Sequence, residues 1–337
     1  MKTQTIKSSA VMPVPGQKLQ WCKDLISIGD LGPEGVKGML DLTMLVKTRP
    51  ADFRRSLAGK QIVLFFEKPS LRTRITFEAG MNGLGGTSMF FDQTSTRLGA
   101  REKLSDIAHN LERWVDGIVL RTFEHTTVTE MAQHAAIPVI NGLSSLEHPC
   151  QALADYFTLM EKFGDLKKIR LAYVGDANNV AHSLMLTAAC LGSKITVAVP
   201  KGYNPDANIL NTALEIAAET GASIEITHDA RAAVKGADAV YTDVWTSMGQ
   251  EIEAAQRKKT FAPYQVNEEL FAQAAPHAVF MHCLPAHRGD EVTDEVMDSP
   301  RSVVFDQAEN RMHAQKAVML ILLGGEIKRL PQRSAHV

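Results

Sequence analysis

The sequence predicts an α/β protein made of two doubly wound parallel-sheet domains joined by bridging helices. Short β-rich runs alternate with longer segments of helical period, which is the pattern of parallel sheets with helices on both faces. The length of 337 residues exceeds what a single hydrophobic core usually supports. An unbroken amphipathic segment, residues 148–163, lies between two sets of strands. We expect this segment to join the domains.

The β-rich runs divide into two sets along the chain. The first set covers residues 61–67, 87–91, 117–122 and 137–141. The second set covers residues 169–176, 194–200, 223–227, 239–244, 278–283 and 302–306. Helices fill the intervals. The last helical stretch, residues 308–327, is too short to form a third domain, so it should pack back on one of the first two.

The composition excludes several classes of protein. With 45% hydrophobic residues and a formal net charge of -2, the chain is typical of a globular protein rather than a nucleic-acid binder or a disordered chain. The polar, proline-interrupted start has no signal-peptide centre, and no run approaches 18 apolar residues. We therefore expect a cytoplasmic protein with no nucleic-acid or membrane partner.

The cysteines and the missing motifs predict neither a metal nor a cofactor. The four cysteines lie far apart, at positions 22, 150, 190 and 283, without a CxxC pair, which argues against a disulfide framework or a zinc site. The chain has no HExxH motif, no P-loop lysine and no G-x-S-x-G elbow. Metal, nucleotide and serine-hydrolase mechanisms therefore have no support.

An anion site is predicted where the first strand meets the next helix. The segment 68–74, KPSLRTR, places a serine, a threonine and two arginines in a first helical turn. Cations there oppose the helix dipole, whereas a bound phosphate would be held by free N–H groups, hydroxyls and a guanidinium. The alternative is a serine N-cap with solvated arginines. Arg121, at the end of the run 117–122, could face the same anion or simply reach solvent.

The start of the bridging segment carries a second polar pair. His148 and Gln151 are three residues apart and share a helix face, where one can donate to a carbonyl oxygen and the other can contact an amide. A capping or buried histidine is the alternative.

The second half carries a different set of candidates. Residues 175–179, GDANN, follow a strand but lack the GxGxxG spacing, so Asn179 is better interpreted as an amide that holds a small carboxylate or amine, or as a helix cap. Asp243 precedes a glycine-containing loop and favours a cationic ligand group, unless it only caps its own turn. Cys283 ends an apolar strand between two histidines, and a buried structural cysteine is its alternative.

Taken together, these motifs resemble those of the ornithine carbamoyltransferases, a family that also contains the aspartate enzymes. SLRTR at 70–74, HPCQ at 148–151, DVWTSMG at 243–249 and HCLP at 282–285 stand in the family's order and spacing. The resemblance covers nearly the whole chain. It implies a carbamoyl phosphate-binding domain, residues 1–147 with 312–337 returning to it, and an ornithine-binding domain, residues 148–311. It also implies a homotrimer, or a multiple of trimers, with active sites at the subunit interfaces.

The resemblance also assigns residues to each substrate. Those for carbamoyl phosphate would be Ser70, Leu71, Arg72, Thr73, Arg97, Arg121, His148, Gln151, Cys283, Leu284 and Arg311. Those for ornithine would be Asn179, Asp243, Ser247 and Met248. Arg97 falls where the family sends a loop into the neighbouring subunit, but many relatives have Gln or His there. Leu71 replaces the Thr or Met of many relatives, and a backbone contact would survive that change.

The implied reaction transfers the carbamoyl group of carbamoyl phosphate to the side-chain amine of ornithine, giving citrulline and phosphate in arginine metabolism. We expect Arg121, His148, Cys283 and Asp243 to be catalytic. Cys283 would help to deprotonate the amine, and Asp243 would fix the α-amino group. Aspartate would need basic residues that the loop after Asp243 lacks; putrescine has no carboxylate and acetylornithine no free α-amine. A dehydrogenase or a non-catalytic anion-binding module could share the fold.

Overall fold

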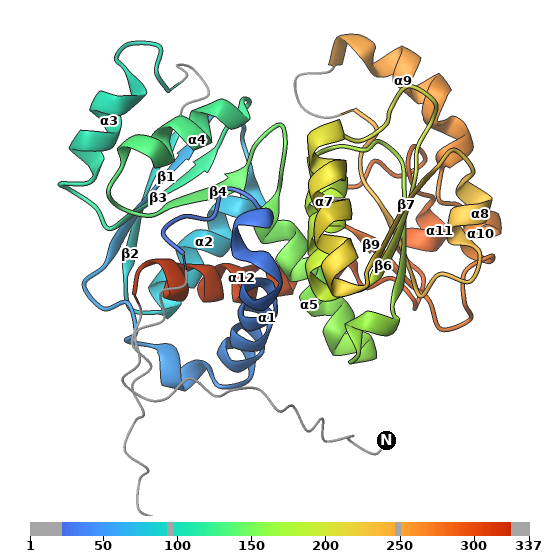
Figure 1. Ribbon diagram of the computed structural model, residues 1–337, viewed down its shortest axis with the longest axis horizontal. Coiled ribbons are helices and arrows are strands. Elements are labelled where there is room, and N and C mark those ends of the chain that lie inside the picture. Colours follow the sequence, from blue (N-terminus) through green and yellow to red (C-terminus); the bar gives the residue numbers. More distant parts are fainter. Residues whose placement is uncertain (1–21, 93–97, 247–250, 325–337) are drawn as a thin grey trace, which may run out of the picture.

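The computed structural model describes residues 22–92, 98–246 and 251–324, which form two parallel β-sheets side by side (Figure 1). The first sheet has four strands in the order β2-β1-β3-β4. Their bounds are β1 Gln61–Phe66, β2 Thr87–Asp92, β3 Gly117–Arg121 and β4 Val139–Leu143. The second sheet has five strands in the order β7-β6-β5-β8-β9. Their bounds are β5 Arg170–Val174, β6 Lys194–Ala198, β7 Ser223–Thr227, β8 Ala239–Thr242 and β9 Val279–His282.

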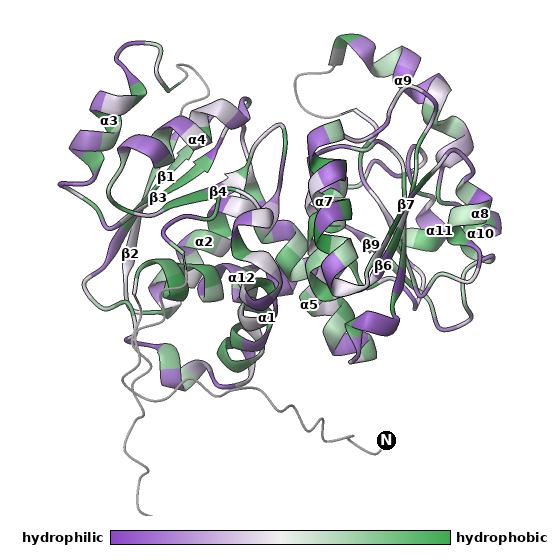
Figure 2. Cartoon of the chain, viewed as in Figure 1, coloured by the Kyte–Doolittle hydropathy of each residue, from purple (hydrophilic) through white to green (hydrophobic). Residues whose placement is uncertain are grey.

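Helices connect successive strands and cover both sheets, as the doubly wound prediction requires. In the first half they are α1 Gly32–Thr48, α2 Leu71–Gly83, α3 Leu104–Leu111, α4 His125–His134 and α5 Pro149–Phe163. In the second half they are α6 Asn179–Leu191, α7 Ala207–Thr220, α8 Ala230–Val234, α9 Ala254–Phe261, α10 Glu268–Phe271, α11 Asp294–Met297 and α12 Val304–Leu322. Figure 2 shows hydrophobic residues concentrated in β1 and β3, whereas α3 carries many hydrophilic residues. The predicted fold class is confirmed.

One predicted strand is wrong. Residues 302–306 were expected to extend the second sheet, but only Ser302 bridges to it, opposite Phe280, and α12 begins at Val304. A short apolar run fits a buried strand and the start of a buried helix equally well. The helix has the longer supporting pattern, because buried residues recur along it to Leu322. The C-terminal helix therefore starts earlier than expected.

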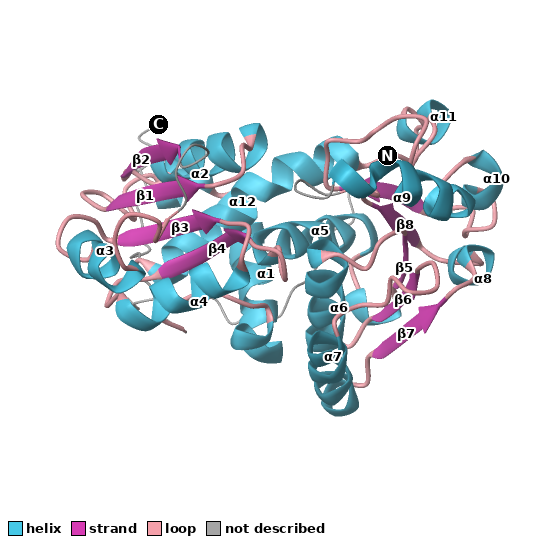
Figure 3. Cartoon of the chain, turned by 90° about the horizontal axis from the view of Figure 1, so that it is seen from above, coloured by secondary structure: helices cyan, strands magenta, loops and turns pink. Residues whose placement is uncertain are grey.

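Helices α5 and α12 lie between the two sheets, as seen from above in Figure 3. Helix α5 packs against β4 of the first sheet and α6 of the second, and α12 packs against α1, α2 and α5. The C-terminal helix thus returns to elements of the first half. Together these helices hold the two sheets in one fixed arrangement.

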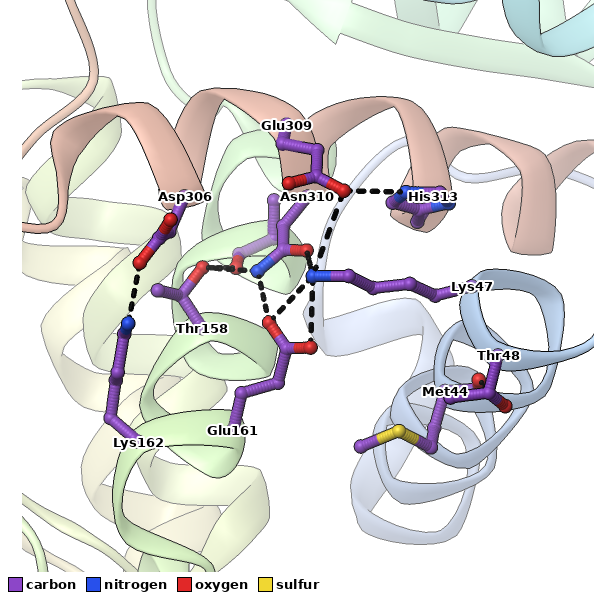
Figure 4. Close-up of polar contacts among 11 residues, drawn as sticks. Met44, Lys47, Thr48, Thr158, Glu161, Lys162, Asp306, Glu309, Asn310 and His313 are labelled. Atoms are coloured by element: carbon purple, nitrogen blue, oxygen red, sulfur yellow. Dashed lines mark hydrogen bonds and ion pairs between the residues drawn. The ribbon is translucent and has the colours of Figure 1, made fainter. Parts of the chain in front are cut away.

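A polar cluster fastens α12 to α5 and α1 (Figure 4). The Asn310 amide nitrogen donates to Thr158 Oγ1 at 2.9 Å and to Glu161 Oε2 at 2.7 Å. Lys47 Nζ on α1 donates to Asn310 Oδ1 at 2.8 Å and pairs with Glu161 at 2.9 Å. A buried amide whose two ends are both bonded fixes the rotation of its helix. Asn310 therefore sets the direction in which the next residue, Arg311, points.

Both sheets reverse their strand order at the edge where polar residues collect. In the first sheet the chain moves outward to β2 on one side of β1 and to β3 and β4 on the other. In the second sheet it moves to β6 and β7 on one side of β5 and to β8 and β9 on the other. Ligands of open α/β sheets bind outside the carboxyl ends of strands at such reversals. In the described ranges, no helix is both long and apolar enough to cross a membrane.

Candidate active site

A cavity of about 390 Å³ lies where the carboxyl ends of the two sheets face each other. Its wall combines residues that follow β1 and β3 of the first sheet with residues that follow β5, β8 and β9 of the second. The cavity thus lies at the strand-order reversal of both sheets.

Most of the predicted site residues line this cavity. They are Ser70, Leu71, Arg72, Thr73, Arg121, His148, Gln151, Asn179, Asp243, Cys283, Leu284 and Arg311. The remaining three, Arg97, Ser247 and Met248, lie outside the described residues. The cavity wall also includes Lys68, Thr246 and His287, which the sequence analysis did not select. Segments up to about 240 residues apart in the chain, such as Ser70 and Arg311, therefore meet here.

Ser70 caps α2 and also belongs to the cavity wall. Its Oγ accepts from the Thr73 backbone N–H at 3.3 Å and lies 3.0 Å from Thr73 Oγ1. Arg311 on α12 donates to Thr73 Oγ1 at 2.8 Å. The capping role and the predicted anion-binding role are compatible, because the cap directs the free N–H groups of the first turn into the cavity.

The two arginines of the first turn of α2 point in different directions. Arg72 lines the cavity. Arg74 pairs with Glu78 at 3.0 Å and stacks 3.8 Å above the Phe90 ring, so its charge is satisfied away from the cavity. Of these two arginines, Arg72 is thus the one placed to contact a bound anion.

Two buried guanidinium groups share the anion side of the cavity. Arg121 is 7% exposed and Arg311 is 3% exposed. Burial, followed by repulsion from Arg311, lowers the pKa of Arg121 to about 9. Burial also lowers the pKa of Arg311. Two cations taken out of water beside each other cost free energy that a bound anion would recover.

His148 stays neutral beside these cations. Burial, then the charges of Arg311 and Arg121, lower the pKa of its imidazole well below the usual value. A neutral imidazole carries one N–H donor and one acceptor, so His148 can donate to a carbonyl oxygen without adding charge.

Several polar atoms of these residues are buried without a partner. In the part of the chain that the structure describes, no hydrogen bond reaches Arg121 Nε, His148 Nδ1, Gln151 Oε1 or Arg311 Nε. Such orphaned groups are rare in proteins and usually mark a place where a ligand or water binds. The unpaired set contains both N–H donors and an amide oxygen, so it suits a ligand that is an anion with its own N–H group.

Asp243 forms the opposite side of the cavity and is 6% exposed. Its carboxylate accepts from Asn178 Nδ2 at 2.7 Å, from its own neighbour Val244 N at 2.8 Å and from Cys283 Sγ at 2.9 Å. The predicted turn-capping role is thus present, but two further donors converge on the same group. All three donors are neutral groups. A buried carboxylate in this state favours a cationic ligand.

The surroundings of Cys283 favour a thiol over a thiolate. It donates to Asp243 Oδ1, and burial together with that carboxylate raises the pKa of the thiol well above its usual value. The following residue, Leu284, has a φ of 58°, a left-handed conformation that is uncommon for a residue with a side chain and often occurs at functional sites.

Capping of α6 and contact with the cavity were both considered for Asn179, but the structure assigns them to two neighbouring asparagines. Asn178 is the N-cap, since its Oδ1 accepts from Val180 N at 2.9 Å and Ala181 N at 3.3 Å. Asn179, the predicted ligand residue, donates to Ser144 O at 2.6 Å and lines the cavity. Asn178 orients Asp243 and was missed. Its place directly before the apolar run of α6 is the signal that could have identified the cap.

Asp243, His282 and Cys283 form a group whose ligand atoms lie within 4.8 Å of one another. Sequence spacing did not predict this group. His282 Nδ1 accepts from Leu284 N at 2.8 Å and Nε2 lies 3.2 Å from Glu291 Oε1, so both imidazole nitrogens are engaged. Only two groups remain available, fewer than the three protein ligands of a typical catalytic zinc site.

Comparison with known proteins identifies the family. Residues 23–161 match the family described as "Aspartate/ornithine carbamoyltransferase, carbamoyl-P binding domain", and residues 167–322 match its "Asp/Orn binding domain". The chain belongs to the aspartate/ornithine carbamoyltransferase family. Together the two matched segments cover most of the chain.

Individual family members are similar over most of their length. The ornithine carbamoyltransferase of Thermococcus kodakarensis is 50% identical over 305 residues, which are 90% of this chain and 97% of that protein. A Pyrococcus furiosus relative named "Ornithine carbamoyltransferase, anabolic" is 49% identical, with 90% and 97% covered. The solved ornithine carbamoyltransferase structure from the same organism superposes with a TM-score of 0.87 at 48% identity, covering 91% of this chain and 98% of that one. The cavity therefore lies in a carbamoyltransferase fold.

Glu147, next to His148, predicts a dependence of stability on pH. Burial raises its pKa to about 7, while Ile28 N and Ser183 Oγ each donate to its Oε2 at 3.1 Å. Because the folded pKa is above the unfolded value of about 4.3, this group's stabilisation is present at low pH and lost as the pH rises through about 7. The free energy of unfolding of the wild type should therefore fall relative to Glu147→Gln between pH 5 and pH 8, by on the order of 2 kcal/mol.

Urea denaturation of both proteins at the two pH values measures this difference. Asp155 and Asp176 also titrate in this pH range, but both are present in the wild type and in Glu147→Gln. Their contributions therefore cancel in the difference between the two proteins. An equal difference at pH 5 and pH 8 would contradict the assignment.

Proposed function

We propose that this protein transfers the carbamoyl group of carbamoyl phosphate to the side-chain amine of L-ornithine, giving L-citrulline and phosphate. The observation that carries the proposal is the division of one cavity into two electrostatic sides. Arg121 and Arg311 are both buried in the cavity wall, whereas Asp243, in the same wall, accepts hydrogen bonds from neutral donors. An anionic donor and a cationic acceptor would each complete one side.

Carbamoyl phosphate would bind on the arginine side. Ser70, Leu71, Arg72, Thr73 and Arg311 would surround the phosphate at the start of α2. Free N–H groups at a helix N-terminus and guanidinium forks are suited to phosphate, and they would also neutralise the charge that grows on it as it leaves. The Leu71 contribution would come from its backbone, since its side chain is exposed.

The carbamoyl oxygen would lie among Arg121, His148 and Thr73. Negative charge develops on this oxygen when the amine attacks, and preorganised donors of this kind contribute about 3 to 4 kcal/mol each in other enzymes. The unpaired Gln151 Oε1 would accept from the carbamoyl amide. Cys283 and Leu284 would lie between the donor and the acceptor.

Ornithine would bind on the Asp243 side. Asp243 would hold its α-amino group, with Asn179, Ser247 and Met248 as further contacts. Its side-chain ammonium, with a pKa of about 10.4 in water, must lose a proton before the nitrogen can attack. The neutral nitrogen then bonds to the carbamoyl carbon, the carbon–oxygen bond to phosphate breaks, and inorganic phosphate leaves.

The geometry constrains how Cys283 could help deprotonation. A thiol that already donates to Asp243 cannot accept a proton. An ammonium group entering beside the pair would lower the pKa of the thiol, because an opposite charge stabilises the thiolate. We infer that Asp243 and Cys283 act as a pair: when ornithine binds, the thiol releases its proton to bulk water, and the resulting thiolate accepts the proton of the side-chain ammonium.

The division of labour between the halves is also proposed. Residues 1–147 with 312–337 would bind carbamoyl phosphate, and residues 148–311 would bind ornithine. The family descriptions of the matched segments support this division. The name of the Pyrococcus furiosus relative supports a role in arginine biosynthesis. A cytoplasmic location stays a prediction.

A homotrimer is proposed, in which a second copy covers the outer face of the first sheet. A groove of about 690 Å³ there is lined by apolar residues that include Phe91, 55% exposed, and Trp114, 67% exposed. Apolar surface of this kind usually marks an interface between proteins. Leu98, in the same groove, directly follows Arg97 in sequence, so Arg97 would reach the neighbouring subunit's carbamoyl phosphate from this face.

An assay with four acceptors tests the reaction. Carbamoyl phosphate should give product with ornithine, and little with putrescine, aspartate or acetylornithine, because only ornithine offers an α-amine to Asp243, a carboxylate and a separate side-chain amine that can attack. Arg72→Ala should lose most of the activity, whereas Arg74→Ala on the same turn should keep it. If ornithine gave no citrulline, the proposed function would be wrong.

Substitutions on the acceptor side test the Asp243–Cys283 pair. Asp243→Asn should raise the KM for ornithine and leave the affinity for carbamoyl phosphate unchanged, since it removes charge from one side alone. Cys283→Ala should lower kcat by about a hundredfold, the usual size of a general-base contribution. Cys190→Ala, on α6 away from the cavity, is the matched control. Unchanged rate and ornithine affinity in Cys283→Ala would rule out its role.

The trimer is tested by the mass of the particle in solution. Light scattering of the purified chain should give three times 36.9 kDa, or a multiple of that trimer. Trp114→Glu should shift the particle toward the monomer, because it places a charge in the apolar groove. A monomeric wild type with full activity would overturn the proposal.

A further inference from the structure

The side-chain amide of Gln151 is held by a hydrogen bond to another residue of its own helix. Its Nε2 donates to Asp155 Oδ1 at 2.8 Å, one helical turn further along α5. Its Oε1 belongs to a residue of the cavity wall and has no partner in the described part of the chain. The two ends of one amide therefore have opposite surroundings.

Asp155 decides which end of the amide is turned inward. It is fully buried, and three donors converge on it: Gln151 Nε2, Gln307 Nε2 at 2.7 Å and Tyr241 OH at 3.0 Å. Burial raises the pKa of Asp155 to about 7, so above that pH it is a carboxylate that only accepts hydrogen bonds; the Gln151 amide nitrogen then faces it and the amide oxygen faces away. The orientation of Gln151 is thus a consequence of the acceptor at position 155.

The same carboxylate connects Gln151 to the acceptor side of the cavity. Gln307 on α12 bonds Asp155 through Nε2, and its Oε1 accepts from the His282 backbone N–H at 3.0 Å. His282 directly precedes Cys283. Asp155 therefore lies at the centre of a buried network that joins α5, α12 and the end of β9. Both glutamines of this network donate a hydrogen bond from the amide nitrogen to Asp155.

We propose that Asp155 is a positioning residue, which holds the Gln151 amide with its oxygen toward the cavity and thereby selects phosphate donors whose transferred group carries an N–H. This inference rests on the proposed function, because it assigns the selected N–H to the carbamoyl group. Asp155 does not line the cavity, so it would act on the donor through the side chain of Gln151, which does.

Acetyl phosphate is the probe that isolates this effect. It shares the carbonyl and phosphate groups of carbamoyl phosphate but carries a methyl group in place of the amine. The methyl group would leave Gln151 Oε1 buried and unpaired, which weakens binding. Without an acceptor at position 155 the Gln151 amide is free to rotate, so carbamoyl phosphate loses its fixed acceptor and the difference in affinity between the two ligands becomes smaller.

The experiment compares the dissociation constants of carbamoyl phosphate, acetyl phosphate and inorganic phosphate by calorimetry. Asp155→Leu should reduce the preference for carbamoyl phosphate over acetyl phosphate by about tenfold. Inorganic phosphate makes no use of Gln151, so its unchanged affinity shows that the arginine side is intact. If Asp155→Leu fails to bind inorganic phosphate, Asp155→Ala, which also lacks an acceptor, is measured against the same criteria.

Two variants serve as matched controls. Asp155→Asn keeps an oxygen for Gln151 and should keep the preference. Tyr241→Phe removes another donor from the same carboxylate without touching Gln151 and should also keep it.

The outcomes separate this inference from the function on which it rests. A wild type that makes no citrulline would overturn the proposed function. A wild type that makes citrulline, together with an Asp155→Leu or Asp155→Ala variant that binds inorganic phosphate normally and keeps the full preference, would overturn the role of Asp155 alone. Loss of the preference in Tyr241→Phe would likewise overturn it, because packing rather than the acceptor would then be responsible.

Discussion

The burial of Arg121 and Arg311 beside each other is the constraint that the rest of the site depends on. Each guanidinium is nearly inaccessible to water, and burial lowers the pKa of both. Such an arrangement persists only because the surrounding structure holds it, since separation or exposure would reduce the repulsion. A bound anion would remove this repulsion, so part of the free energy spent on burying the two guanidinium groups would be recovered when the proposed phosphate donor binds.

Arg311 reaches this position only because the chain returns. It belongs to α12, the last described helix, whereas Arg121 ends β3 and Thr73 opens α2. The cluster of Asn310, Glu161 and Lys47 fixes α12 against α5 and α1 one residue before Arg311. Packing of the C-terminal helix and the electrostatics of the anion side are therefore one feature of the structure. A displacement of α12 would change both.

The sequence predicted the parts of the site that are local and missed those that depend on orientation. Strand ends followed by Arg121 or Asp243, and the odd charges at the start of α2, are visible in order along the chain. The strand predicted for residues 302–306 was wrong because a short apolar segment has no periodicity that distinguishes a strand from a helix. Asn178 was missed because neighbouring asparagines look alike until one of them caps the helix.

Arg311 was named only through the family resemblance, since an arginine inside a helix has no local signal for the cavity that it enters. Asp155 was missed for a related reason, because a polar residue in an amphipathic helix usually faces solvent.

The opposed charges of the cavity bear on the hardest step of the proposed reaction. An ammonium group near Asp243 alone would keep its proton, because an adjacent carboxylate raises the pKa of a cation. The arginines act in the opposite direction on a nitrogen that moves toward the carbamoyl carbon, since like charges favour its neutral form.

Ornithine can use both effects at once, because it carries two amines separated by a flexible chain. Its α-amino group would stay charged beside Asp243, while its side-chain amine would lie nearer the arginines and lose its proton more easily. A diamine without the carboxylate would have no means of telling its two ends apart. The charge asymmetry of the cavity would thus fix both the orientation of the acceptor and the end that reacts.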